Sequence, residues 1–216
     1  WSATRAAHAV QISPKTLAES RARLPRATMT LVENGRDHAA RWDVAAPVPG
    51  GAPTVVTFGH AVNKRAGLVV EAMAKIAPEV RLVVLGARGG QAEGLEKLAA
   101  EVGVADRLVL PGFVPTEEYR RLVSSAAVVV LASSDEGFGL PVCEANHFEI
   151  PCVVTSDSGL GEIHQERVVV AEPEAAALAT AVSGALAGGS TRHTTDSDQT
   201  WRDTASQLRD LCPRRR

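Results

Sequence analysis

The stretch Ala127-Val-Val-Val-Leu-Ala-Ser-Ser-Asp-Glu-Gly-Phe-Gly-Leu-Pro-Val-Cys-Glu144 contains the change of hydrophobic pattern that decides the fold. Residues 127–131 form a continuous apolar run, which is typical of a strand that is buried on both faces of a parallel sheet. The glycines that follow predict a turn, and a helix is predicted from about Leu140 to Phe148. The stretch therefore predicts one strand–loop–helix unit of an α/β protein.

The same alternation of short apolar runs and helical patterns continues on both sides of this stretch. Runs rich in β-branched residues predict strands at 54–58, 81–85, 108–110, 152–155 and 168–170. Apolar residues at 3.6-residue spacing predict helices over 68–76, 95–102, 116–126 and 175–186. This order predicts a doubly wound, Rossmann-like parallel sheet with helices on both faces.

The two ends of the chain depart from that pattern. Three elements are predicted near the N-terminus, namely a strand at 9–12, a helix at 13–24 that Ser13 and Pro14 open, and a strand at 28–32. Residues 44–53 contain AAPVPGGAP and are expected to form a linker, and a last amphipathic helix is predicted at 201–211. The chain thus divides into residues 1–50, a main domain at 53–188, and a flexible segment with the returning helix at 189–216.

The composition excludes several classes of protein. A chain of 216 residues with 45% hydrophobic residues can bury one large core, which excludes a disordered tail. The formal net charge of −2 lacks the basic excess that a nucleic-acid partner requires. The three cysteines, at 143, 152 and 212, have no paired spacing, which favours a reducing compartment. Because the sequence has neither a long apolar run nor a signal pattern, we expect a cytoplasmic protein without a transmembrane segment.

Two loops carry the residues suited to chemistry. In a doubly wound sheet, ligands bind beyond the carboxyl ends of the strands. After the strand at 127–131, Gly137 and Gly139 allow a close approach to the backbone and lead into a helix N-terminus, which favours a phosphate or a developing anion. Glu136 and Glu144 flank this segment and could face one cleft, although a solvated glycine turn is the plainer alternative.

The second loop follows the strand at 54–58 and reads Gly59-His-Ala-Val-Asn-Lys-Arg65. Lys64 and Arg65 would face the same crevice as the Glu136 loop, which suits a ligand that carries a diphosphate, although such cations are usually solvated. A third loop, at 86–90, lacks the G-x-G-x-x-G spacing and a following acidic residue. We therefore do not expect a NAD site.

The segment from Glu136 to Glu144 matches the E-x7-E signature in its form EGFGLPxxE. On this motif the chain resembles the C-terminal, donor-binding domain of retaining glycosyltransferases of the GT-B fold, in the large family 4 of sugar transferases (glycosyl transferases group 1). Five further segments are similar to the family and extend the likeness over most of residues 8–211, namely 32–37, 59–64, 108–112, 156–163 and 200–208.

The resemblance implies a site for a nucleotide-diphosphate-sugar, with Glu136 and Lys64 as catalytic residues. It implies that Glu144 binds the ribose hydroxyls, that Glu136 contacts the donor sugar, and that Lys64 with His60 neutralises the departing diphosphate. The backbone N–H groups of residues 138–140 would hold the distal phosphate and the sugar. The complete set of donor-binding residues implied in this way is Gly59, His60, Lys64, Arg65, Gly112, Val114, Glu136, Gly137, Phe138, Gly139, Leu140 and Glu144, with the nucleobase near Gly112 and Val114.

Three residues depart from the family pattern. His60 replaces an arginine, Arg65 replaces a glycine and could supply the missing charge, and Glu149 replaces a small glycine. We favour a solvated Glu149 over one that reshapes the rim of the pocket. Neither a cofactor nor a metal is expected, because the resemblance to GT-B enzymes implies a transfer that needs no bound metal.

The leading hypothesis is a retaining transfer of a hexose from the donor to an acceptor hydroxyl. Residues 1–50 resemble only the tail of the N-terminal acceptor domain and the segment that crosses between domains. We therefore expect the missing N-terminal domain in cis or as a separate chain, with an unknown acceptor, and interpret the start at Trp1 as a truncation. Two alternatives stay open: a non-catalytic nucleotide-sugar-binding module or remnant that needs a partner chain, and a GT-B epimerase. The excess of arginine over lysine suggests a bacterial source.

Overall fold

A computed structural model of the chain describes residues 8–44, 51–188 and 199–211. Its main body is built on a six-stranded sheet, whose strands are β3 (Thr54–Phe58), β4 (Arg81–Leu85), β5 (Leu108–Gly112), β6 (Val128–Leu131), β7 (Cys152–Thr155) and β8 (Val169–Ala171). The order across the sheet is β5-β4-β3-β6-β7-β8, and all neighbouring strands are parallel. The predicted α/β class and the predicted parallel sheet are confirmed.

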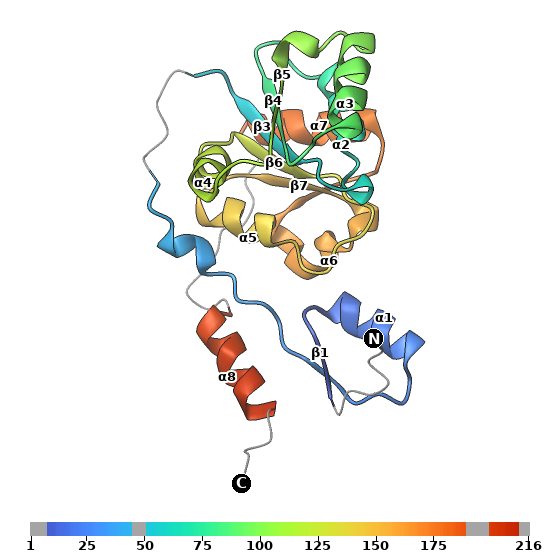
Figure 1. Ribbon diagram of the computed structural model, residues 1–216, viewed down its shortest axis with the longest axis vertical. Coiled ribbons are helices and arrows are strands. Elements are labelled where there is room, and N and C mark those ends of the chain that lie inside the picture. The colour runs from blue at the N-terminus through green and yellow to red at the C-terminus, as the bar shows by residue number, and fades with distance from the viewer. Residues whose placement is uncertain (1–7, 45–50, 189–198, 212–216) are drawn as a thin grey trace.

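Helices cover both faces of this sheet (Figure 1). One face carries α2 (Ala66–Met73), α3 (Gly90–Glu101) and α7 (Ala175–Leu186). The opposite face carries α4 (Thr116–Ser124), α5 (Leu140–His147) and α6 (Leu160–His164). Short 3-10 turns complete the connections, namely η2 (His38–Arg41), η3 (Val62–Lys64), η4 (Ala105–Arg107), η5 (Ser156–Ser158) and η6 (Gln165–Arg167).

The core consists of two layers because successive strand residues point to opposite faces of the sheet. Val55 and Val128 pack with α2, α3 and α7, whereas their neighbours Val56 and Val129 pack with α4, α5 and α6. All four side chains are fully buried. This two-sided burial is the physical reason for the continuous apolar runs in the sequence.

A smaller unit precedes the main body. It consists of β1 (Ala9–Gln11), α1 (Pro14–Arg23) and β2 (Met29–Leu31), in which the two strands pair in parallel. Ser13 caps α1 through a capping box with Thr16. The last helix, α8 (Trp201–Leu211), lies beside the segment that follows β2, where the Thr204 hydroxyl donates to the Glu33 carbonyl at 2.7 Å. Figure 1 shows this unit and α8 on the side of the main body that carries α5 and α6.

Most of the predicted elements are confirmed within one or two residues of their predicted ends. The structure adds α6, which has only five residues and therefore no readable period. Residues 45–50 of the linker that was predicted over 44–53 lie outside the described residues, as do residues 189–198 of the predicted flexible segment and Cys212. Cys143 and Cys152 are buried free thiols. No helix in the described part of the chain is long and apolar enough to cross a membrane.

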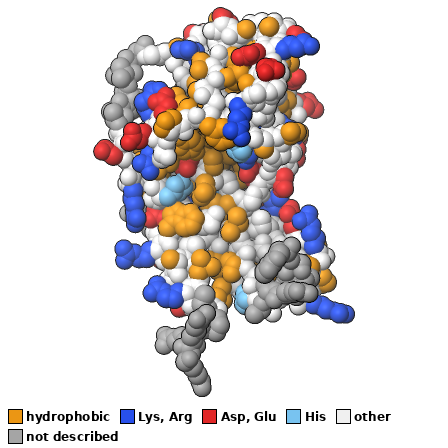
Figure 2. All heavy atoms as spheres, viewed as in Figure 1, with side chains coloured by type: hydrophobic (Ala, Val, Ile, Leu, Met, Phe, Trp, Pro, Cys, Tyr) orange, Lys and Arg blue, Asp and Glu red, His pale blue; other side chains and the backbone are white. Residues whose placement is uncertain are grey.

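The strand order reverses between β3 and β6, and this reversal positions the candidate site. β4 and β5 extend the sheet on one side of β3, whereas β7 and β8 extend it on the far side of β6. The loops after β3 and β6 are therefore neighbours, and the Ser134 amide donates to the Asn63 carbonyl at 2.9 Å. Such a reversal is where open α/β sheets bind their ligands. Figure 2 shows basic and acidic side chains intermixed around the outline of the molecule in this view, with hydrophobic ones along its middle.

Candidate functional site

A cavity of about 220 Å³ lies at the carboxyl ends of β3, β4, β5 and β6. Its lining is mostly apolar and consists of Phe58, His60, Lys64, Leu85, Gly86, Gly112, Phe113, Val114, Tyr119, Leu131 and Pro141. Typical ligand pockets hold roughly 300–1,000 Å³, so this cavity would enclose only part of a nucleotide-sized ligand. Four predicted site residues line it, namely His60, Lys64, Gly112 and Val114.

Lys64 links the cavity to the first glutamate of the motif. Its ammonium lies 2.5 Å from Oε1 of Glu136, and the hydroxyl of Ser133 donates to the same oxygen at 2.7 Å. Both members of this ion pair are partly buried, with side chains 17% and 12% exposed. No described residue donates a hydrogen bond to Oε2 of Glu136, and the ammonium has three N–H donors. Oε2 of Glu136 can therefore accept a hydrogen bond from a hydroxyl of a ligand while the Lys64 ammonium donates one to an anion.

The loop after Glu136 offers backbone donors. Gly139 has the left-handed conformation with φ of 77°, and α5 begins at the next residue. Among the described residues, the N–H groups of Phe138, Gly139 and Leu140 have no hydrogen-bond partner. Free N–H groups at the start of a helix attract anions. A side chain at Gly139 would lie 2.5 Å from Cδ2 of Leu160, so only glycine fits there.

Glu144 occupies a different environment inside α5. Its side chain is nearly buried, with the residue 7% exposed, and accepts hydrogen bonds on both oxygens. Nε2 of His38 lies 3.0 Å from Oε1, and the Tyr119 hydroxyl donates to Oε2. Burial and the adjacent carboxylate raise the pKa of Tyr119, so its hydroxyl keeps its proton and remains a donor. Glu144 is thereby held in one orientation behind the cavity wall that Tyr119 forms.

His60 is a weaker electrostatic partner for an anion than an arginine would be. It lies at the surface of the cavity, four residues before Lys64. Partial burial, and then the charge of Lys64, lower the pKa of His60 below its ordinary value of 6.5. The imidazole is therefore neutral at pH 7 and acts as a hydrogen-bonding group.

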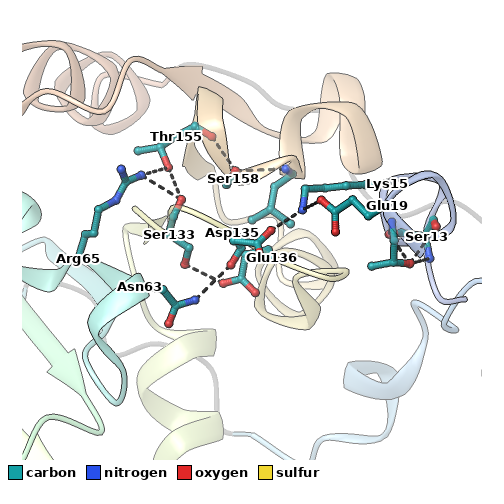
Figure 3. Close-up of polar contacts among 12 residues, drawn as sticks. Ser13, Lys15, Glu19, Asn63, Arg65, Ser133, Asp135, Glu136, Thr155 and Ser158 are labelled. Atoms are coloured by element: carbon teal, nitrogen blue, oxygen red, sulfur yellow. Dashed lines mark hydrogen bonds and ion pairs between the residues drawn. The ribbon is translucent and has the colours of Figure 1, made fainter. Parts of the chain in front are cut away.

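Arg65 has other partners than the phosphate that was expected for it (Figure 3). Its guanidinium donates to the carbonyls of Ala132 and Ser133 at 2.6 and 3.0 Å and forms a two-pronged pair with Asp157 at 2.7 and 2.8 Å. A fifth contact reaches the Thr155 hydroxyl at 2.9 Å. These hydrogen bonds lower the pKa of the Asp157 carboxyl. Arg65 thus ties together the loops after β3, β6 and β7 and does not line the cavity.

The smaller N-terminal unit also contacts the Glu136 loop. Lys15 of α1 forms ion pairs with Asp135 and with Glu19, the latter at 2.7 Å (Figure 3). A side chain on Gly137 would meet Cδ1 of Ile12 at 3.3 Å, which shows how closely this unit approaches. The N-terminal unit therefore borders the loop that carries the first glutamate.

The structure brings most of the predicted residues to the carboxyl ends of the strands. Gly59, His60, Lys64, Glu136 and the loop from Gly137 to Leu140 lie at the ends of β3 and β6. Gly112 and Val114 lie at the end of β5 and line the cavity, whereas Glu144 lies deeper and Arg65 is bound to other loops. The Gly59 position is tight, since a side chain there would meet Cγ1 of Val84 at 2.7 Å. Glu149 is exposed, as expected.

Sequence reasoning missed several residues around the cavity, namely His38, Phe58, Phe113 and Tyr119. Tyr119 lies in the helix that was predicted over 116–126, and because a buried tyrosine hydroxyl requires a partner, it could have been paired with a carboxylate. Phe113 is 65% exposed, and the Arg88 guanidinium lies 4.8 Å from its ring centre. No group of three or more His, Cys, Asp or Glu within the described ranges could hold a metal ion.

Comparison with known proteins places the chain in a family. The sequence model described as "Glycosyl transferases group 1" matches residues 40–199, which is most of the chain. The chain belongs to this family. The match includes the cavity, the Lys64–Glu136 pair and Glu144.

Relatives whose names describe glycosyltransferases agree with this assignment. The chain is 35% identical over 120 residues to the D-inositol 3-phosphate glycosyltransferase of Xylanimonas cellulosilytica, covering 52% of this chain and 28% of the relative. It is 32% identical over 168 residues to the GDP-mannose:cellobiosyl-diphosphopolyprenol alpha-mannosyltransferase of Xanthomonas oryzae, covering 70% and 43%. The aligned region thus spans less than half the length of either relative.

A solved structure shows the same fold. Sucrose-phosphate synthase from Thermosynechococcus elongatus superimposes with a TM-score of 0.74 at 25% identity, covering 94% of this chain and 57% of that one. The chain therefore belongs to a family of glycosyl transferases, and its fold corresponds to a part of a GT-B fold.

Proposed function

We propose that the chain is the donor-binding region of a retaining glycosyltransferase of family 4, which transfers a hexose from a nucleotide-diphosphate-sugar to an acceptor hydroxyl. The observation that carries this proposal is the Lys64–Glu136 pair beside the unpartnered N–H groups of residues 138–140. A cation, a carboxylate and free amides at one end of the sheet suit a ligand with an anionic half and a hydroxyl-rich half.

The proposed chemistry is stabilisation of the leaving group. When the bond from the sugar to the distal phosphate breaks, negative charge develops on the diphosphate. The Lys64 ammonium and the amides of Gly139 and Leu140 are preorganised donors for that charge, and His60 adds a hydrogen bond. Oε2 of Glu136 accepts from a hydroxyl of the sugar and fixes its orientation. Removal of one such donor in other enzymes costs about 3–4 kcal/mol.

The nucleoside half is assigned to the cavity and its wall. Glu144, which Tyr119 and His38 hold in place, accepts hydrogen bonds from the two ribose hydroxyls through its remaining lone pairs. The nucleobase rests against the backbone of Gly112 and near Val114, both of which line the cavity. No cofactor or metal ion has a role in this proposal, since the cation that faces the phosphate is Lys64.

The comparisons support the donor class and leave the acceptor open. The name of the Xanthomonas relative specifies GDP-mannose as its donor, which favours a nucleotide-diphosphate-sugar here. Because the chain spans only part of its relatives, we assign the acceptor site to an N-terminal domain, in cis or on a separate chain. We propose a cytoplasmic bacterial enzyme on composition alone. The proposal that the transfer retains the configuration of the sugar rests on the resemblance of the 136–144 motif to that of retaining glycosyltransferases.

Calorimetric titration of the chain with UDP, GDP and ADP tests the proposal. One of the three is expected to bind with 1:1 stoichiometry, and the corresponding nucleotide sugar is expected to compete for the same site. The matched control is Lys97→Met, which removes an exposed lysine on α3 and should leave the affinity unchanged. A chain that binds none of the three would contradict the proposal and favour a remnant without a donor site.

A further inference from the structure

A buried polar cluster lies behind the Glu136–Leu140 loop, outside the cavity. It consists of Arg36, from the segment after β2, and His164, the last residue of α6. Their exposed fractions are 8% and 3%. Nη1 of Arg36 lies 2.7 Å from Nδ1 of His164, and Nε2 of His164 lies 2.6 Å from the carbonyl oxygen of Phe138. The cluster therefore connects the N-terminal segment to the backbone of the loop.

The protons in this cluster have only one consistent arrangement. A guanidinium donates and never accepts, so Nδ1 of His164 must be the acceptor and carry no hydrogen. Nε2 then carries the ring hydrogen and donates it to the Phe138 carbonyl. Burial lowers the pKa of His164 to about 4, and the charge of Arg36 acts in the same direction. The imidazole is therefore neutral at neutral pH, which is the state that this arrangement requires.

Phe138 is held by its ring as well as by its carbonyl. The Arg36 guanidinium lies 5.0 Å from the ring centre, and the His164 ring packs edge-on at 5.5 Å. Because a trans peptide is planar, its C=O and the next N–H point in opposite directions. A carbonyl that is fixed toward His164 directs the N–H of Gly139 away from His164 and toward the open end of the loop.

Arg36 is itself fixed by the segment that leads into α8. Its backbone N–H donates to the Gln199 carbonyl at 2.8 Å, and its guanidinium lies 3.7 Å from Oε2 of Glu33. A second contact joins the Arg36 guanidinium to the carbonyl of Ile163 at 3.4 Å. The cluster thus has little freedom to rearrange, so the direction of the Gly139 N–H is set from three parts of the chain.

We propose that Arg36 and His164 are positioning residues that aim the Gly139 N–H at the distal phosphate of the donor. This inference rests on the proposed function and adds two residues to it that never touch the ligand. Loss of this positioning should weaken the binding of a diphosphate but not of a monophosphate. The reason is that the Gly139 amide contacts only the distal phosphate, whereas the nucleoside binds at Glu144 and in the cavity.

The test is a comparison of diphosphate and monophosphate affinities in His164→Leu, which removes both hydrogen bonds of the imidazole. The probes are whichever of UDP, GDP or ADP binds the wild-type chain, and the corresponding monophosphate, both measured by calorimetry. A misaimed donor to a charged group should weaken diphosphate binding about tenfold. The affinity for the monophosphate should stay within about twofold of the wild-type value, because the monophosphate lacks the phosphate that the Gly139 amide contacts. His164→Gln can donate and accept in place of the imidazole and should restore most of the loss.

The matched control is His147→Leu, which makes the same change in the last turn of α5, where His147 packs on Phe148. It should leave both affinities unchanged. If His164→Leu weakens mono- and diphosphate equally, or changes neither, the positioning role is wrong even though the proposed function stands. If the wild-type chain binds no nucleotide, the proposed function itself is wrong, and the positioning role falls with it.

The wild-type chain also permits a test that does not depend on the folding of a variant. Nitrogen-15 NMR of the imidazoles should show His164 neutral, with its proton on Nε2, and the Nε2 resonance should shift on addition of the diphosphate but not of the monophosphate. A proton on Nδ1, or an equal response to both ligands, would overturn the inference.

Discussion

The two glutamates of the 136–144 motif are chemically identical and only eight residues apart, yet their surroundings differ in kind. Glu136 lies in a loop, pairs with the Lys64 ammonium, and keeps one oxygen free of described donors. Glu144 lies inside α5, where a neutral tyrosine hydroxyl and an imidazole occupy both oxygens. The difference teaches that the half-open end with its ion pair suits a reacting group, whereas the buried end, where both carboxylate oxygens already accept hydrogen bonds, suits fixed recognition of hydroxyls.

The largest expected effect follows from Glu136→Gln in an enzyme that includes the acceptor domain. The amide keeps the size of the side chain but removes the charge that holds both Lys64 and the sugar hydroxyl. Turnover should fall roughly 100- to 1,000-fold, as when one transition-state partner is lost, while the Kd of the nucleoside diphosphate changes little. Steady-state kinetics with separate calorimetry measures this, and unchanged turnover would remove Glu136 from the chemistry.

The next effect concerns the other member of the same pair. Lys64→Met removes the ammonium that faces the cavity, so nucleoside diphosphate affinity should fall roughly 10- to 100-fold, the range for a charge-assisted hydrogen bond. Monophosphate affinity should change much less. Calorimetry with both ligands checks this ratio against Lys97→Met, and an equal loss for both ligands would contradict the assignment of Lys64 to the diphosphate.

Glu144→Gln should produce the opposite pattern at the buried end. Because Glu144 is assigned to the ribose, mono- and diphosphate affinities should fall together, about tenfold. The variant should also lower the free energy of unfolding by about 1–2 kcal/mol, since Tyr119 and His38 lose a charged acceptor. Tyr119→Phe removes only one of the two hydrogen bonds to Glu144, so it should lower the nucleotide affinities and the free energy of unfolding by less. Calorimetry and urea unfolding measure them, and a loss confined to the diphosphate would reverse the two assignments.

The smallest effect is a pH dependence at the open end. Since the pKa of His60 is lowered below 6.5, protonation adds a cation beside the diphosphate only in acid. Wild-type affinity should therefore rise as the pH falls from 8 toward 5.5 and level off once the imidazole of the free chain is protonated. In His60→Asn, the change of affinity with pH reports the titration of the ligand itself. The difference between the wild-type curve of affinity against pH and this control curve therefore reports the protonation of His60. Parallel curves would show that His60 does not meet the diphosphate.

The fold could be predicted well from the sequence because its sheet is buried on both faces. Runs such as 127–131 and 54–58 have no amphipathic ambiguity, and the glycines after them mark the strand ends. Helix α6 was missed because five residues contain too little of a helical period. Because α6 was not predicted, His164, the last residue of that helix, was not recognised as a candidate residue either.

The site could be predicted only where one local motif carries it. Glu136, Glu144 and Lys64 stand in recognisable loops, and the structure gives each of them a partner. Lys64 and Glu136 are each other's partner, whereas the contact of Glu144 with His38, 106 residues away, was not predictable. The contact of Arg36 with His164, 128 residues away, was not predictable either. Arg65 shows the limit of local reasoning most clearly. It neighbours Lys64 in sequence, but its left-handed backbone conformation turns the guanidinium to the carbonyls after β6 and to Asp157.

A crystal structure of the chain with its nucleoside diphosphate tests the division between the two ends most directly. The account predicts both ribose hydroxyls within hydrogen-bond distance of the Glu144 carboxylate. It also predicts the distal phosphate on the Lys64 ammonium and on the Gly139 N–H. A nucleotide bound in the reverse direction, with its phosphates at Glu144, or bound away from the ends of β3 and β6, would contradict it.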